Sequence, residues 1–276
     1  MAKENTVYLF GKVSQARISL TEEGIPATGM LLLETVRRTY ATSDFALRGD
    51  QRYDVPCVYS RNRNVIEHGI AGIKRGDIVL VKGCICSNNV KRKFVCTECG
   101  HVQYEIGAVA IYIDPVFVKK IESDLPPEEA LKVVEKAYEI SNNILLVGTI
   151  CKEPGEDAYY QDKDTRLEKF EFLVAANRIR HILEDNPDKK VDFIHVKCYG
   201  KECSNYKEYL HKGSSILING AIQTRAVTVK AVCDDCGAIM SKSIYVTEIV
   251  PYHIEYLDKC GMEYEPIDVD ENEIQE

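Results

Sequence analysis

GDIVLVKGCICSNNVKRKFVCTECG, residues 76–100, recurs later in the chain as GSSILINGAIQTRAVTVKAVCDDCG, residues 213–237. Gly76, Gly83, Cys96 and Cys99 each have an identical residue 137 positions further along. An offset that stays constant through both strand-like and loop-like segments indicates duplication of one whole structural unit. The chain is therefore predicted to contain two copies of one domain, each with a Cys-x-x-Cys turn.

The rest of the sequence divides around these two copies. We expect a first repeat over residues 1–120, a connector over 121–142, a second repeat over 143–257 and a tail over 258–276. Each repeat is long enough to bury its own core. The connector starts with two prolines and carries an apolar stripe at helical spacing, which predicts a packed helix. The tail has almost no apolar content and is expected to be disordered.

Each repeat consists of five short, alternating strand-like segments. In the second repeat they are NNILLVGTI, KFEFLVAA, FIHVKCYG, SSILINGAIQT and KSIYVTEIV, with a short helical pattern between the third and the fourth. Five strands with one short helix favour a small closed barrel over a sandwich. The predicted fold class is mainly β, with two tandem five-stranded barrels joined by an α-helical connector.

The negative charge of the chain is concentrated outside the two repeats. Of the net charge of -8, residues 258–276 contribute -7 and residues 121–142 contribute -4, which leaves +3 for the repeats. The repeats are therefore compatible with a polyanionic partner.

Targeting and membrane signals are not found in the sequence. No apolar run reaches the roughly 20 residues that a membrane span needs, and the N-terminus lacks the pattern of a signal peptide. We expect no membrane partner and a cytoplasmic location, where the eleven cysteines are thiols or metal ligands rather than disulfides.

A family resemblance is carried by FIHVKCYGKECSNYKEYLHKGSSILINGAIQTR, residues 193–225. An aromatic, a strand, Tyr199-Gly200-Lys201, a helix with a Tyr-Leu-x-Lys-Gly end, and a strand that ends in Gly-x-x-x-Thr-Arg follow in that order. This segment resembles the bacterial single-stranded DNA-binding protein family. Through the internal repeat, the resemblance extends to the first half of the chain. It implies the oligonucleotide-binding (OB) barrel fold, binding of single-stranded DNA without catalysis, and roles in DNA replication, recombination and repair.

The resemblance also implies aromatic residues on which bases stack. Carried over by position, these are Phe193 and Tyr199. A shift of 140 residues through the duplication places Tyr53 and Tyr59 at the equivalent positions of the first repeat. Stacking suits binding without sequence preference, because every base has a π-face. An alternative interpretation places these aromatics in the barrel core.

The chain has no tryptophan, on which the family relies, so stacking would fall to Tyr, Phe and Arg. A guanidinium can both stack and neutralise phosphate. The basic residues predicted to contact nucleic acid are Arg37, Arg38, Arg61, Arg63, Lys91, Arg92, Lys93, Arg178, Arg180, Arg225 and Lys230. RNA is not excluded as a ligand.

The two Cys-x-x-Cys turns are typical of zinc knuckles, in which two thiolates lie on a tight turn that a glycine follows. Each turn supplies half of a tetrahedral site. Cys96, Cys99, Cys233 and Cys236 are therefore predicted to share one structural zinc ion. Alternatively, the first repeat closes its own site with Cys84, Cys86 or His101, but the second repeat has no equivalent residues. A redox role is disfavoured because strand-like segments flank both turns.

The sequence thus predicts a non-catalytic protein that coats and protects single-stranded DNA. Two alternatives are a replication or recombination accessory factor that uses the barrels for protein contacts, and a zinc-dependent nucleic-acid enzyme. The acidic tail could contact replication or recombination proteins. Assembly into a homo-oligomer stays open.

Overall fold

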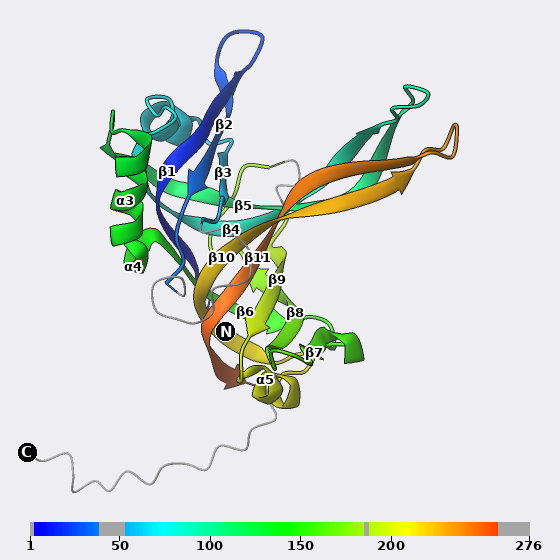
Figure 1. Ribbon diagram of the computed structural model, residues 1–276. Helices are drawn as coiled ribbons and strands as arrows, with labels where there is room; N and C mark the ends of the chain where they lie inside the picture. Colours follow the sequence, from blue (N-terminus) through cyan, green and yellow to red (C-terminus); the bar gives the residue numbers. More distant parts are fainter. Residues whose placement is uncertain (1–2, 39–52, 185–187, 259–276) are drawn as a thin grey trace, which may run out of the picture.

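Two consecutive β-barrels make up most of the chain. The computed structural model describes residues 3–38, 53–184 and 188–258 (Figure 1). Barrel one consists of β1 (Asn5–Leu20), β2 (Pro26–Glu34), β3 (Cys57–Ser60), β4 (Ile78–Val95) and β5 (Val102–Glu122), with the short helical segments α2 (Arg63–Val65) and η1 (Ile66–Ile70) between β3 and β4.

Barrel two repeats this order of elements. It consists of β6 (Asn142–Ile150), β8 (Glu168–Asn177), β9 (Val191–Tyr199), β10 (Ser215–Val232) and β11 (Ile239–Asp258), with helix α5 (Cys203–Tyr209) between β9 and β10. A 3-10 turn, η2 (Glu156–Ala158), and a short strand, β7 (Tyr159–Gln161), are added beside β8. The predicted fold class, two tandem five-stranded barrels joined by a helical connector, is confirmed.

Each barrel closes because its first strand pairs with two neighbours. Strand β1 pairs with both β2 and β4, and a parallel bridge between Val58 and Ile113 joins β3 to β5. In barrel two, β6 pairs with both β8 and β10, and Val196 of β9 meets Ile249 of β11 in the same way. Alternate side chains along these strands point inward and form the buried apolar core.

The two barrels join through their first strands. Strands β1 and β6 pair antiparallel, so the eleven strands formed by the described residues belong to one continuous sheet. Val7 lies opposite Ile144, which is its own counterpart at the 137-residue offset. When two copies of a domain are related by a two-fold rotation, a residue on the axis lies opposite the equivalent residue of the other copy. The barrels are therefore related by a pseudo-two-fold axis through this residue pair.

Hydrogen bonds at the ends of the first strands repeat with the same symmetry. The Asn5 side chain donates to the carbonyl of Ile85 at 3.0 Å and accepts from the Ile85 N–H at 2.9 Å. The Asn142 side chain makes the same two bonds to Ile222, both at 2.8 Å. Both asparagines are buried, so these bonds satisfy groups that would otherwise be costly to bury.

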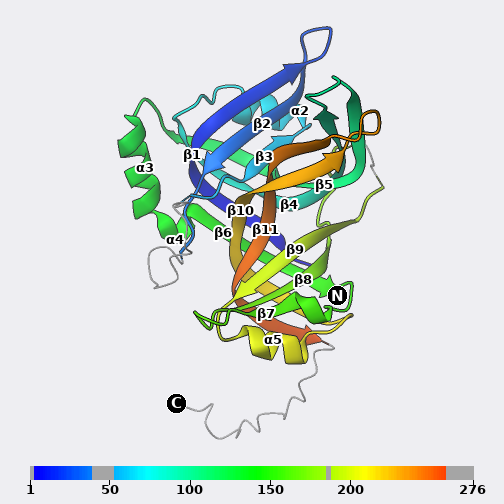
Figure 2. The same cartoon turned by 45° about the vertical axis from the view of Figure 1, so that its right-hand side comes forward.

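The last two strands of each barrel extend far beyond it as a β-hairpin. The β4–β5 hairpin and the β10–β11 hairpin leave the body on the same side, and their tips lie next to each other (Figures 1 and 2). The amide side chain of Gln103 links the two hairpins near the tips. It donates to the carbonyl of Val232 at 2.9 Å and accepts from the N–H of Asp234 at 3.1 Å.

The connector forms helices α3 (Pro127–Lys136) and α4 (Tyr138–Ser141), which pack against barrel one (Figure 1). Ala130 and Val134 are buried against Phe10 and Ile78. The connector is thus a fixed part of barrel one rather than a tether. None of the described helices has the length and apolar character needed to cross a membrane. Of the tail predicted to be disordered, residues 259–276 lie outside the described residues.

Two equivalent glycines lie at irregularities in the strand pairing of the two hairpins, the kind of site at which a strand bends. The strand register shifts at Gly83 and at Gly220. A Cβ atom at Gly220 would lie 2.5 Å from the carbonyl oxygen of Val250, and one at Gly83 would lie 2.5 Å from that of Asp114. Only glycine therefore allows the two backbones to approach this closely.

We expect Gly220→Ala to lower the free energy of unfolding by about 1–3 kcal/mol, because the added methyl group meets backbone rather than a movable side chain. Urea denaturation followed by circular dichroism measures this change. Gly72→Ala is the matched control, since a Cβ atom there meets nothing within 4 Å. Equal costs for the two variants would show that the bend does not require glycine.

Candidate nucleic-acid interface and metal centre

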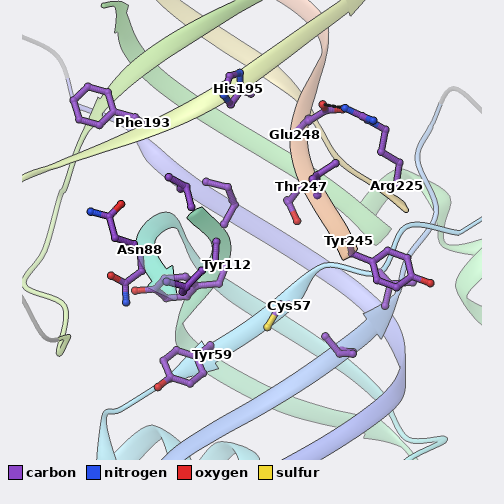
Figure 3. Close-up of a pocket in the computed structure, with 18 of the residues that line it drawn as sticks. Cys57, Tyr59, Asn88, Tyr112, Phe193, His195, Arg225, Tyr245, Thr247 and Glu248 are labelled. Atoms are coloured by element: carbon purple, nitrogen blue, oxygen red, sulfur yellow. Dashed lines mark hydrogen bonds and ion pairs between the residues drawn. The ribbon is translucent and has the colours of Figure 1, made fainter. Parts of the chain in front are cut away.

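A groove with a volume of about 1320 Å³ lies between the two barrels, at the bases of both hairpins. Strands β3, β4 and β5 of barrel one and β9, β10 and β11 of barrel two each contribute side chains to its walls. Figure 3 shows these side chains converging from both barrels. The groove is therefore one site built by both copies of the repeat.

Two of the four predicted stacking residues line this groove. Phe193 of β9 is 49% exposed. Tyr59 of β3 is half-buried, and its ring packs edge-on against Tyr112, with ring centroids 5.5 Å apart (Figure 3). Tyr112 is itself buried, so it supports the ring of Tyr59 and leaves that ring as the surface that a base can reach.

Three of the predicted basic residues also line the groove: Arg61, Lys91 and Arg225. Arg225 forms an ion pair with Glu248 at 2.7 Å, yet its side chain stays 42% exposed. The hairpin arms carry three further candidates. Lys93 and Lys230 are exposed on the arms, whereas Arg92 pairs with Glu105 at 2.6 Å.

The other two aromatic candidates lie away from the groove lining. Tyr53 packs in the cluster beneath the connector, and its hydroxyl donates to Glu135 of α3 at 2.5 Å. Tyr199 is half-buried beside Gln223, and burial raises its pKa. These contacts hold Tyr53 and Tyr199 against neighbouring segments outside the groove lining, so base stacking on them stays a prediction.

The strand pairing also corrects the 140-residue shift that was used to relate the aromatics. Met30 lies opposite Tyr59 in barrel one, and Glu171 lies opposite Lys197 in barrel two. Lys12 pairs with Glu34, and Thr149, the residue 137 positions after Lys12, pairs with Ala175, so strands β2 and β8 match at an offset of 141. Tyr59 therefore corresponds to Lys197, an offset of 138. The offset changes because the loop between β2 and β3 differs in length from the loop between β8 and β9. The pairing of each third strand with its neighbour, rather than a single offset, therefore identifies the equivalent residues.

Arg37 and Arg178, both predicted to contact DNA, are buried instead. The Arg37 side chain is 4% exposed and pairs with Asp54 at 2.6 Å. The Arg178 side chain is also 4% exposed and pairs with Asp192 at 2.8 Å and with Glu184 at 2.9 Å. Burial and ion pairing occupy both guanidinium groups in this structure, which argues against direct contact of Arg37 and Arg178 with phosphate.

These buried pairs hold each barrel to the hairpin of the other. The carboxylate of Asp54 in barrel one accepts from the N–H of Thr224 on β10 at 2.7 Å. In the symmetric arrangement, Asp192 of barrel two accepts from the N–H of Ser87 on β4 at 2.8 Å. We refer to the Arg37–Asp54–Thr224 and Arg178–Asp192–Ser87 contacts as the two cross-barrel links.

The two carboxylates of the cross-barrel links differ in their pKa. Burial raises the pKa of Asp54 to about 6, and Arg37 offsets this only in part. Burial also acts to raise the pKa of Asp192, but hydrogen bonds from Arg178 and Ser87 outweigh it and hold this pKa below its usual range. The second link is therefore the one whose charged form is better stabilised.

The remaining arginine candidates have partners outside the groove lining. Arg38 donates to the Asn143 side chain at 2.8 Å and lies over the ring of Tyr252. Arg180 pairs with Asp114, and Arg63 on α2 forms an exposed pair with Glu67 at 2.7 Å. Arg38 and Arg180 thus fasten neighbouring segments of the barrels together, while Arg63 stays at the surface.

The groove has two further residues that the sequence reasoning missed. Tyr245 of β11 is 69% exposed, and His195 of β9 lies exposed two residues after Phe193 (Figure 3). His195 could have been found from the alternation of β9, because it points to the same side as Phe193. Tyr245 lies in the last strand, and no feature of the sequence distinguished it from the neighbouring apolar residues.

The four cysteines predicted to share a metal lie together where the hairpin tips meet. Their ligand atoms are all within 4.8 Å of one another, and the sulfur of Cys96 lies 3.6 Å from that of Cys236. The sulfurs of Cys99 and Cys233 are 3.7 Å apart. A tetrahedral zinc site with Zn–S bonds of about 2.3 Å requires sulfurs about 3.8 Å apart, so these residues fit the ion.

The backbone of the two turns is equivalent as well. Gly100 donates to the carbonyl of Cys96 at 3.0 Å, and Gly237 donates to that of Cys233 at 2.9 Å. Both glycines have positive φ, 75° and 73°. Within the described residues, this is the one group of three or more potential metal ligands. Cys84 and Cys86, considered for a separate site, are buried in another cluster beside Tyr112.

Comparisons with known proteins agree with this architecture. Residues 141–256 match the model of the single-strand binding protein family. Single-stranded DNA-binding protein 1 of Clostridium acetobutylicum is 27% identical over 117 residues, which cover 42% of this chain and 94% of that protein. Single-stranded DNA-binding protein 2 of Listeria monocytogenes is 29% identical over 117 residues, 42% of this chain and 64% of that protein.

A solved structure resembles the chain over nearly its whole length. The crystal structure of the single-stranded DNA-binding protein from Thermus aquaticus aligns with a TM-score of 0.57 at 14% identity, and the alignment covers 96% of this chain and 98% of that one. This likeness shows that both barrels, and not only the matched residues 141–256, share the fold. The comparisons therefore show that residues 141–256 are similar to the single-strand binding protein family, and that the chain as a whole has the fold of two tandem OB barrels.

Proposed function

We propose that this protein binds single-stranded DNA in the groove between its barrels, without catalysing a reaction on it. The observation that carries the proposal is the lining of the groove. Tyr59, Phe193 and Tyr245 offer ring faces for base stacking, and Arg61, Lys91 and Arg225 offer charge for phosphates. Stacking together with a positively charged track is the usual basis of binding to single strands without sequence preference.

The groove favours a single strand over a duplex. Stacking on Phe193 or Tyr245 requires an unpaired base that can turn its face to the ring, whereas the bases of a duplex are already stacked on each other. Relatives named as single-stranded DNA-binding proteins match 117 residues of this chain, and the family model matches residues 141–256, which supports the same ligand here. By coating exposed strands, the protein would protect them during replication, recombination and repair.

Titration of fluorescent oligo-dT, oligo-rU and a duplex at two salt concentrations tests this function. We expect oligo-dT to bind more tightly than the duplex. With about three groove cations on phosphates, the slope of log K against log salt should be about -2. Tighter binding of the duplex would contradict the proposal. Absence of nucleic-acid binding would favour an accessory factor that uses its barrels for protein contacts.

A zinc ion bound by Cys96, Cys99, Cys233 and Cys236 is the second part of the proposal. The geometry of the four sulfurs supports it. Four thiolates would fill the tetrahedron and leave no position for a water or a substrate, which favours a structural ion over a catalytic one. The cysteines come from both hairpins, so the ion would tie the two tips together.

We expect the purified protein to contain about one zinc ion per chain, and the Cys96→Ser variant to contain almost none, because three thiolates bind the ion far less tightly. Elemental analysis of the two proteins measures this. Cys57→Ser, which changes a cysteine of the groove, should keep its zinc. Two zinc ions per chain in the unmodified protein would rule out the shared site.

A further inference from the structure

The groove lies across the pseudo-two-fold axis that relates the two barrels. Several pairs of equivalent residues both line it, including Leu32 with Leu173 and Asn88 with Arg225. These equivalences follow from strand pairing and from the 137-residue offset of the hairpins. In shape, the groove therefore has two related halves, and a strand that runs along it contacts both barrels.

The two halves of the groove differ in the side chains at the positions where bases would stack. Tyr59 corresponds to Lys197, as shown by their partners Met30 and Glu171. Tyr245 lies opposite Ala226, and its equivalent Val109 lies opposite Asn89, the counterpart of Ala226. None of these aromatic positions is thus occupied by an aromatic residue in both barrels.

The same holds for Phe193. It lies opposite Ala175 on β8. The bridge between Thr35 and Asp54 places Val55 at the equivalent position of barrel one. Among the described residues, barrel two therefore offers the exposed rings of Phe193 and Tyr245 to the groove. Barrel one offers the half-buried ring of Tyr59, at a different place on its wall, with the buried Tyr112 behind it (Figure 3).

The polar residues differ in the same way. Arg225 of barrel two has Asn88 as its equivalent, and Glu248 of barrel two has Tyr112. Barrel two thus contributes an Arg–Glu ion pair to its wall, and barrel one contributes an amide and a supporting ring at the matching positions. At these positions, the two-fold rotation therefore places neither an aromatic residue on an aromatic residue nor a charged residue on a charged residue.

From this asymmetry we infer that a single strand lies in the groove in one 5′-to-3′ direction. The inference rests on the proposed function, since it concerns the same groove and the same ligand. A single strand is chemically directional. In a groove with true two-fold symmetry, rotation would exchange the two directions, and both would bind with equal free energy. Here reversal of the strand moves its bases onto different side chains, so the two directions are inequivalent.

The size of the preference follows from the stacking contacts. Loss of one base stack on reversal corresponds to about a tenfold preference for one direction, or about 1.4 kcal/mol. The barrel that meets the 5′ end is then the same in about nine of ten complexes.

Photocrosslinking with directional probes tests this inference. Two oligo-dT strands, of the shortest length that saturates at one strand per chain, carry 5-iodouracil near the 5′ end or near the 3′ end. After irradiation, mass spectrometry quantifies crosslinked peptides that contain Tyr59 against those that contain Phe193 or Tyr245. With a tenfold preference, the ratio of barrel-one to barrel-two peptides should be about 10 with one probe and about 0.1 with the other, a change of about a hundredfold.

An unchanged ratio between the two probes, with efficient crosslinking, would overturn the directional inference and leave the proposed function intact. Absence of binding by either probe would instead reject the proposed function itself.

A variant that adds aromatic residues supplies a further test. Val55→Phe combined with Val109→Tyr gives barrel one the two aromatic residues of barrel two without removing any side chain that holds the fold. We expect the directional ratio to fall toward equality in this variant. A ratio as large as in the unmodified protein would overturn the assignment of direction to the aromatic asymmetry.

Discussion

Arg178→Met is expected to lower the free energy of unfolding by about 3–5 kcal/mol, which is the usual cost of removing one partner from a buried ion pair. The guanidinium of Arg178 is the shared partner of Asp192 and Glu184, whose side chains are 0% and 3% exposed. Without it, two carboxylates stay buried with less compensation, and the link from barrel two to the β4–β5 hairpin weakens. Urea denaturation measures the loss.

Two comparison variants make this prediction specific. Arg63→Met removes an exposed arginine that pairs with Glu67, and should cost less than about 1 kcal/mol. Arg37→Met breaks the symmetric cross-barrel link and should resemble Arg178→Met. If Arg178→Met proved no more costly than Arg63→Met, the buried link would not contribute to holding the barrels together.

Phe193→Ala is expected to weaken binding of oligo-dT by about five- to a hundredfold, because each base stack contributes roughly 1–3 kcal/mol. Phe193 is half-exposed in the groove, so its removal takes away a stacking face and opens no core cavity. Fluorescence anisotropy with a labelled oligonucleotide measures the change. The double variant Phe193→Ala with Tyr245→Ala should bind more weakly still.

Phe117→Ala is the matched control for the groove variants. Phe117 is 40% exposed on β5, comparable to Phe193, but it lies outside the groove lining. Its replacement should leave the affinity for oligo-dT within about twofold, a change of less than 0.5 kcal/mol. Equal losses for Phe117→Ala and Phe193→Ala would place the bound strand elsewhere.

The fold could be predicted because the duplication is visible in local sequence features. Gly76 and Gly213 keep their spacing to the two cysteine turns. The alternation of strand residues and the positions of glycines likewise depend only on neighbours in the chain. The proximity of the four cysteines at the hairpin tips could also be predicted, because each copy of the repeat supplies half of a tetrahedral site; the zinc ion itself stays a proposal.

The contacts of individual side chains could be predicted less well. Arg37 and Arg178 look like surface cations in the sequence, but each pairs with an aspartate 14 or more residues later in the chain. Asp54 and Asp192 in turn accept from backbone N–H groups of the other barrel. The predicted equivalence of Tyr59 and Tyr199 is wrong because loops of unequal length precede the third strand in the two repeats, and a constant offset does not allow for that. The arginine contacts and this equivalence both depend on tertiary packing rather than on local sequence pattern.

Hydroxyl-radical footprinting with and without oligo-dT tests the central claim most directly, because it reports which exposed side chains the strand covers. The account predicts that oligo-dT protects Phe193 and Tyr245 in the groove, while Phe117 outside it stays as reactive as in the free protein. Protection of Phe117 with unchanged reactivity of Phe193 and Tyr245 would contradict binding in the groove between the barrels.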